Sequence, residues 1–301
     1  MTKRILALVM ALCLVFALAA CNNGGNDDET TTGAADTAVN GETVVDTAAN
    51  NETEAASGDT TDVSADASTE AASENETEAA SQNEADAPAK KPQTTAEILE
   101  YFNTAINKVK PNSKGITCKY LKNSQAGRAE LGNLPGFIQD MANDLISSNM
   151  GEDEAKKNKT VTSAAEKNAL FAVENQSWSS KLGVNNIQSA TLKESNGSYI
   201  ITINVKPDEA SANISYGAGN TPKAFSVVTP KSITDNAGPA ASIIKDVNIG
   251  YRNGKIVATI DAATGNVTDV DYYFEWNLKL TAVGINVSIW FGINQVFSIA
   301  W

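Results

Sequence analysis

The chain lacks histidine and has only three cysteines in 301 residues. Without histidine, Ser-His-Asp and Cys-His catalysis are excluded, and the commonest metal ligand in proteins is missing. Cys13 and Cys21 lie near the amino terminus, which leaves Cys118 as a lone thiol in the rest of the chain. One thiol cannot form an intramolecular disulfide, and there is no CxxC motif. We therefore predict no metal site and no cofactor.

Large apolar side chains are almost absent from residues 22–96, where four valines are the only sizeable ones. The same stretch holds 17 acidic residues and two lysines. A segment of this composition cannot bury enough apolar surface to offset the entropy lost on ordering. We predict a disordered acidic tether over residues 21–93. Residues 51–57 and 75–81 both read NETEAAS, and the acids are spread out, which favours a spacer over a calcium- or partner-binding tail.

The tether accounts for the negative charge of the whole chain. The net charge is −13, yet residues 97–301 carry no net charge. A neutral domain has no net field to attract DNA or RNA, so we predict no nucleic-acid partner.

The first 20 residues predict a cleaved signal peptide. Lys3 and Arg4 precede 16 uncharged, mostly apolar residues. A spanning helix needs about 20 apolar residues, so a shorter run that ends in small residues indicates a signal. The tetrapeptide LAAC at residues 18–21 resembles the lipobox of bacterial lipoproteins. The resemblance implies that Cys21 receives diacylglycerol and becomes the new amino terminus; an ordinary signal peptide is the alternative.

These features together predict a lipid-anchored protein on the outer face of the cytoplasmic membrane. More than one acyl chain gives stable anchoring. A flexible tether of about 75 residues reaches roughly 45–50 Å, and further when its charges repel. That reach suits passage through a thick cell wall, which favours a Gram-positive source.

Residues 94–301 predict a single globular domain that begins with two helices. Thr94 and Glu97 fit a capping box, and Pro111 predicts the end of the first helix. A second helix is expected from a cap at Asn133 to Gly151. The predicted apolar stripes are Ile98, Phe102, Ala105, Ile106 and Val109 in the first helix, and Leu134, Ile138, Met141 and Leu145 in the second. Between them, Ile116, Cys118 and Tyr120 alternate as a short strand, in which Cys118 is expected to be buried and unreactive.

The last 60 residues predict an antiparallel meander with one apolar face. Asn253-Gly254 predicts a hairpin that pairs Tyr251 with Ile256. Gly265 closes a three-residue loop that sets Ala258 opposite Val270 and Ile256 opposite Tyr272. A turn at residues 283–284 then pairs Phe274 with Ile293, Trp276 with Phe291, Leu278 with Ile289 and Leu280 with Val287. A further hairpin is expected at residues 196–197, and residues 152–182 and 207–242 are expected to be irregular loops.

The expected fold class is therefore α+β. We predict an antiparallel β-meander sheet with the two N-terminal helices packed on its apolar face. A slip of one residue would put every apolar side chain of a strand on the wrong face, so the agreement of successive turns supports one register.

The polar face of the meander supplies the candidate binding residues, which are Trp290, Asn277 and Tyr273. Trp290 falls opposite Asn277 and among further amides, an arrangement typical of a sugar-stacking platform. The alternative is that a loop, such as residues 207–242, covers it. Asp269, Asp271 and Glu275 share this face, where a solvated surface is favoured over a carboxylate pair or a loose calcium site.

The order helix, strand, helix and meander resembles uncharacterised lipoproteins of clostridial bacteria over residues 94–301. The shared elements are SWSSKL at 177–182, IDAATG at 260–265 and IAW at 299–301, and none is a catalytic motif. Helices on a curved antiparallel sheet are also similar to the lipid-carrying LolA and LppX families, at the level of fold alone. We expect a non-enzymatic domain that binds a surface protein, a glycan or a small ligand. A carrier of hydrophobic ligands is the first alternative, and an enzyme without histidine is the second.

Overall fold

The computed structural model describes residues 91–301, except for the side chains of residues 239 and 240. The predicted signal peptide, Cys21 and most of the predicted tether lie outside these residues.

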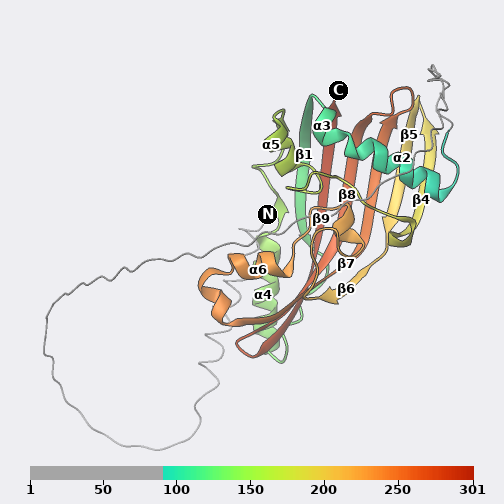
Figure 1. The fold of residues 1–301 in the computed structure, drawn as a ribbon. Helices are drawn as coiled ribbons and strands as arrows, with labels where there is room; N and C mark the ends of the chain where they lie inside the picture. The colour runs from blue at the N-terminus through green and yellow to red at the C-terminus, as the bar shows by residue number, and fades with distance from the viewer. Residues whose placement is uncertain (1–90) are drawn as a thin grey trace, which may run out of the picture. The chain divides into compact units, whose positions relative to one another are not determined.

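An antiparallel sheet forms the body of the described chain (Figure 1). Its strands are β1 (Gly115–Gln125), β2 (Gly151–Glu152), β3 (Lys159–Val161), β4 (Ile187–Ser195), β5 (Ser198–Val205), β6 (Asp208–Ser211), β7 (Ile244–Asp261), β8 (Val267–Ala282) and β9 (Ile285–Ala300). They are ordered β2-β1-β9-β8-β7-β5-β4, with β3 paired to β1 and β6 paired to β7. The predicted α+β class with an antiparallel sheet is confirmed.

The helices are α2 (Thr95–Asn107), α3 (Val109–Asn112), α4 (Gly136–Ser148), α5 (Ala164–Leu170) and α6 (Pro230–Asn236). Helix α2 runs across the strands (Figure 1). Its Phe102 and Ile106 are fully buried. Helix α4 lies on the same side, because its Asn143 accepts a hydrogen bond of 2.7 Å from Gln125, which is paired with the core residue Phe291. Both predicted N-terminal helices therefore lie on the apolar face.

The start of α2 follows the prediction, and its end does not. The Thr94 hydroxyl accepts from the Glu97 amide at 3.2 Å, and the Glu97 carboxylate accepts from the Thr94 amide at 2.9 Å. Pro111 does not end the helical segment. The helix is interrupted at Lys108 and continues as α3. Pro111 lies in the first turn of α3, where its missing N–H costs no hydrogen bond.

Helix α4 differs from its prediction in both its start and its face. Its N-cap is Pro135 rather than Asn133. The residues that it buries fully are Ala142 and Ile146, whereas Met141 is 60% exposed. The physical reason is Asn143, which accepts a 2.7 Å hydrogen bond from the Ala129 amide and so fixes the helix rotation.

Three predicted turns are confirmed. The turns at residues 196–197 and 283–284 have positive φ at both positions, as tight hairpins require. Gly265 also has positive φ, and the Asp261 side chain holds that loop by accepting from the Thr264 amide at 2.7 Å. The paired residues that follow agree with the predicted register, including Phe274 with Ile293 and Trp276 with Phe291.

The hairpin predicted at Asn253-Gly254 is wrong. Residues 244–261 form one strand, β7, which pairs along its length with β8. Asn253 and Gly254 form a bulge opposite Phe274, with Asn253 at φ 55°. A left-handed residue before glycine suits a bulge as well as a tight turn. The 16-residue β8 is long enough to pair with both halves of β7. This pairing keeps β7 extended and so favours the bulge over the turn.

Two other predictions require correction. A bulge after Cys118 in β1 leaves Tyr120 half-buried and puts Leu121 in the core instead. The segments 152–182 and 207–242 are not wholly irregular, because they contain β3, α5, β6 and α6.

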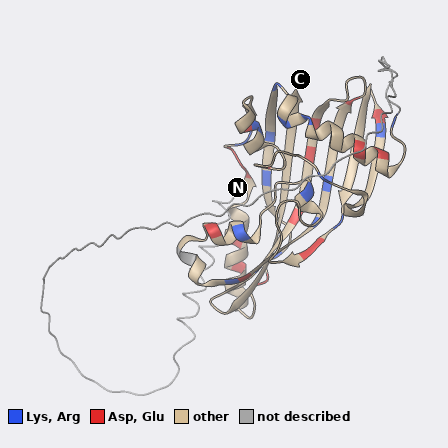
Figure 2. Cartoon of the chain, viewed as in Figure 1, with Lys and Arg blue, Asp and Glu red and all other residues tan. Residues whose placement is uncertain are grey.

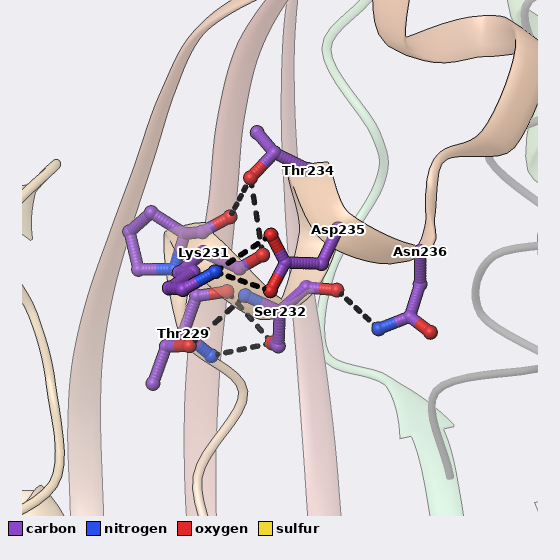
Figure 3. Close-up of polar contacts among 7 residues, drawn as sticks. Thr229, Lys231, Ser232, Thr234, Asp235 and Asn236 are labelled. Carbon is purple, nitrogen blue, oxygen red and sulfur yellow. Dashed lines mark hydrogen bonds and ion pairs between the residues drawn. The ribbon is translucent and has the colours of Figure 1, made fainter. Parts of the chain in front are cut away.

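The segment around α6 covers part of the apolar face. Thr229 caps this helix by accepting from the Ser232 amide at 3.1 Å, and Lys231 pairs with Asp235 one turn later (Figure 3). The hydroxyl of Tyr251 in β7 donates to the Val228 carbonyl and so ties the segment to the sheet.

Candidate functional site

The open face, which we define as the side of the sheet opposite the helices, presents the predicted binding residues. Trp290 on β9 is paired with Asn277 on β8, and Tyr273 on β8 is paired with Asn294 on β9. All four side chains alternate with core residues, so the strands place them together on one face. The predicted register of these residues is confirmed.

Trp290 is covered by an arginine and not by the segment 207–242. The guanidinium carbon of Arg252 lies 3.8 Å from the centre of the Trp290 ring, in a cation–π contact. Arg252 reaches this position from β7, just before the bulge. Sequence analysis missed Arg252, because the residue was assigned to a hairpin next to the predicted turn. A sugar could stack on this face of Trp290 only if Arg252 moved away.

Arg252, Glu275 and Tyr273 form a hydrogen-bonded chain beside Trp290. Arg252 Nε donates to Glu275 Oε2 at 2.6 Å, and the Tyr273 hydroxyl donates to Glu275 Oε1 at 2.9 Å. Burial by itself would raise the pKa of Glu275, but hydrogen bonds from Arg252, Asn253 and Tyr273 lower it below the ordinary value. Burial and the bond to Glu275 raise the pKa of Tyr273 to about 12. Glu275 is therefore an anion fixed by its neighbours, and Tyr273 is neutral.

Asn277 lies below the surface of this face. It is 1% exposed, and its amide nitrogen donates to Ser288 Oγ at 3.2 Å and to the Ile289 carbonyl at 3.1 Å. In this conformation Asn277 supports the strand pair and is out of reach of a ligand.

Tyr273 lies between two pockets of the open face. The larger, about 370 Å³, is lined by Gln188, Asn204, Val205, Pro207, Arg252, Asn253, Gly254, Lys255 and Tyr273. The smaller, about 240 Å³, is lined by Lys255, Val257, Asp271, Tyr273 and Asn294. Tyr273 and Lys255 belong to both. Of the three predicted binding residues, Tyr273 is therefore the one that borders open pockets.

The carboxylates of the open face are held apart by separate partners. Asp269 pairs with Lys119 at 2.7 Å, and Asp271 accepts from Asn294 at 2.7 Å. Within residues 91–301, no group of acidic or cysteine side chains is close enough together to share a metal ion. Lysines, arginines and carboxylates are mixed along the strands of the sheet (Figure 2).

The opposite side of the sheet is filled by aromatic side chains. Trp276 and Phe291 stack with their centres 4.6 Å apart, and Phe225 contacts Tyr272 and Phe274 edge to face. These rings are close to fully buried. A lipid carried between sheet and helices would have to displace this core.

Two buried chemical groups are held inside this core. Burial raises the pKa of the Cys118 thiol to about 11, which makes it a poor nucleophile. Burial lowers the pKa of Lys110 to about 8. The Lys110 ammonium donates to the carbonyls of Val173 and Gln176 at 2.7 and 2.8 Å, so it fastens the segment after α5 to α3. Sequence analysis missed this lysine, because nothing in its local pattern indicates burial.

No protein-family model, curated protein or solved structure matches this chain. The resemblance to clostridial lipoproteins and the fold analogy with LolA and LppX therefore stay predictions. Among the helices within residues 91–301, none combines the length and the apolar character needed to cross a membrane.

Proposed function

We propose that this chain is a non-enzymatic binding protein, held to the outer face of the cytoplasmic membrane through lipidated Cys21, whose ligand binds on the open face of the sheet. The observation that carries the proposal is the position of Tyr273. Its hydroxyl is fixed by Glu275, and its ring borders pockets of about 370 and 240 Å³. Small-ligand pockets usually measure about 300–1,000 Å³ and present a few fixed polar groups.

A binding role fits the chemistry of the site better than catalysis does. The chain has no histidine, and Glu275 is held as an anion by Arg252. A general acid or base works best when its pKa lies near the working pH. Glu275 and Tyr273 are shifted away from neutrality in opposite directions. The filled core gives no support to the alternative of a hydrophobic-ligand carrier.

The test is a crystal structure of the full chain purified in mild detergent from its own membranes. We expect additional density on the open face beside Tyr273, and we expect the same preparation of a Lys255→Glu variant to lack it. Density between α2 and the sheet would instead support the carrier. A Cys21→Ala chain that is cleaved at the signal peptide and still stays in the membrane would contradict the anchoring part of the proposal.

A further inference from the structure

Five polar side chains form a row across the open face, at right angles to the strands. We call this the transverse row, and its members are Lys122 on β1, Asn294 on β9, Tyr273 on β8, Lys255 on β7 and Asn204 on β5. Each is the direct pairing partner of the next. Neighbouring strands are about 4.8 Å apart, so the row extends over about 19 Å. A ligand that contacts all of it must be elongated.

The middle of the row is an aromatic ring that leans along the sheet. Gly292 has no side chain, and Ser124 and Tyr273 share the space above it, with Ser124 Oγ 2.6 Å from the position that a Cβ would occupy. The Tyr273 hydroxyl and Cε2 lie 3.4 and 3.8 Å from the position that a Cβ on Gly292 would occupy. The hydroxyl is also fixed to Glu275 at 2.9 Å. An aromatic ring held in this way is a rigid contact surface that loses little entropy when a ligand stacks on it.

The row carries two lysines, Lys122 at one end and Lys255 next to the Asn204 end. Lys122 and Lys255 are exposed, and neither forms an ion pair with another residue of the described chain. The row itself contains no carboxylate. Three carboxylates lie beside it. Glu275 pairs with Arg252, Glu152 faces Lys122 across the strands and pairs with Lys157, and Asp271 accepts from Asn294 of the row at 2.7 Å. The two unpaired lysines therefore favour a ligand that carries one anionic group near Lys122 and another near Lys255.

We infer that the transverse row binds an acidic oligosaccharide, with one sugar ring stacked on Tyr273 and its carboxylate groups paired with Lys255 and Lys122. A sugar ring has an apolar C–H face that matches an aromatic ring and a rim of hydroxyls that matches the amides of Asn204 and Asn294. The pockets on either side of Tyr273 leave room for the neighbouring sugars. This assignment rests on the proposed function, because it names the ligand of the same face.

The experiment is a binding measurement on the full chain in detergent, by calorimetry, with hexagalacturonate as the acidic probe and cellohexaose as the neutral one. We expect the acidic probe to bind and the neutral probe to bind at least about tenfold more weakly, a difference of about 1.4 kcal/mol. Affinity for the acidic probe should fall as salt rises, because exposed charge pairs are screened. Comparable affinity for both probes would overturn the acidic assignment.

Four variants locate the site. Tyr273→Ala and Lys255→Gln should each weaken binding of the acidic probe, the former by about tenfold or more. Tyr273→Phe keeps the ring and should stay within about threefold of the wild type, which protects the test if the alanine variant misfolds. Lys279→Gln removes a lysine of the same face outside the row and should have no effect. Equal loss for Lys279→Gln and Lys255→Gln would place the site elsewhere.

The outcome also separates this inference from the proposed function. Failure of the wild type to bind hexagalacturonate, together with ligand density on the open face of natively purified protein, overturns the acidic-sugar assignment alone. Failure of both measurements overturns the two proposals together.

Discussion

The guanidinium of Arg252 lies 3.8 Å from the centre of the Trp290 ring, although the two residues belong to strands separated by β8. The arginine is held there by Glu275 and by a 3.4 Å hydrogen bond to the Ala126 carbonyl. Residue 126 also donates its amide to the Trp290 carbonyl at 2.9 Å. The contact thus joins β7, β8, β9 and the chain after β1 into one surface.

Trp276 and Trp290, which lie on the paired strands β8 and β9, should differ in their contribution to stability. Trp276 is fully buried, and truncation of a buried tryptophan costs about 3–5 kcal/mol. Trp290→Ala loses a partly exposed cation–π contact worth about 1 kcal/mol. Urea midpoints of Trp276→Ala and Trp290→Ala should therefore be well separated. Equal losses would contradict the partial exposure of Trp290.

The Arg252–Glu275 pair should make stability depend on pH in the acid range. Because the folded-state pKa of Glu275 is lowered from its ordinary value of 4.5, the unfolded chain binds more protons as the pH falls. The contribution of Glu275 to stability is complete above its pKa in the unfolded chain. It is lost as the pH falls through its pKa in the folded protein. Glu275→Gln should cost about 1–3 kcal/mol at pH 7. The gap from wild type should close toward pH 3; a gap independent of pH would contradict this.

Cys118 should resist thiol reagents in the folded protein. Its side chain is fully buried and its pKa is raised to about 11, so about one thiol in a thousand is ionised at pH 8. In a variant with Cys13 and Cys21 replaced by alanine, we expect no measurable labelling by a disulfide reagent at pH 8 within minutes. Labelling should become rapid in urea. Fast reaction of the native protein would show that β1 opens readily.

Cys21→Ala should release the protein from membranes or leave an uncleaved precursor. The LAAC sequence predicts that the lipid is attached at this residue, and acyl chains contribute roughly 0.8 kcal/mol per buried methylene. Detergent phase partitioning measures the change, with Cys118→Ala as the control that stays in the detergent phase. Identical partitioning of both variants, with the signal peptide cleaved from each, would remove the support for a lipobox.

The bulge in β7 should tolerate glycine and reject a β-branched residue at position 253. Asn253 has a φ of 55°, which costs roughly 1–2 kcal/mol for most side chains. Asn253→Gly should therefore stay closer to wild-type stability than Asn253→Val, even though both lose the hydrogen bond to Glu275. Thermal melting of the pair provides the comparison, and the reverse order would contradict the left-handed conformation.

The sequence predicts the sheet best where turn chemistry and alternation agree. Residues 265 and 283–284 each set a register that the structure confirms, because a slip would bury polar side chains. It predicts poorly where one local signal has two structural outcomes. Asn253-Gly254 suits a turn and a bulge equally, and only pairing with β8 decides. The face and register of Tyr273 and Trp290 are predicted correctly, whereas Arg252 is missed, because it contacts Trp290 through long-range pairing that no local pattern records.

The bulge also decides which residues of β7 a ligand can meet. Arg252 and Lys255 are three positions apart, and in a regular strand they would point to opposite faces. The extra residue reverses the alternation, so both reach the open face while Tyr251 and Ile256 both stay in the core. Deletion of Gly254 would turn the core-facing side chains of one half of β7 to the open face, and the open-face side chains to the core. Changes of chain length should thus be tolerated at the hairpin tips 196–197 and 283–284, and not here.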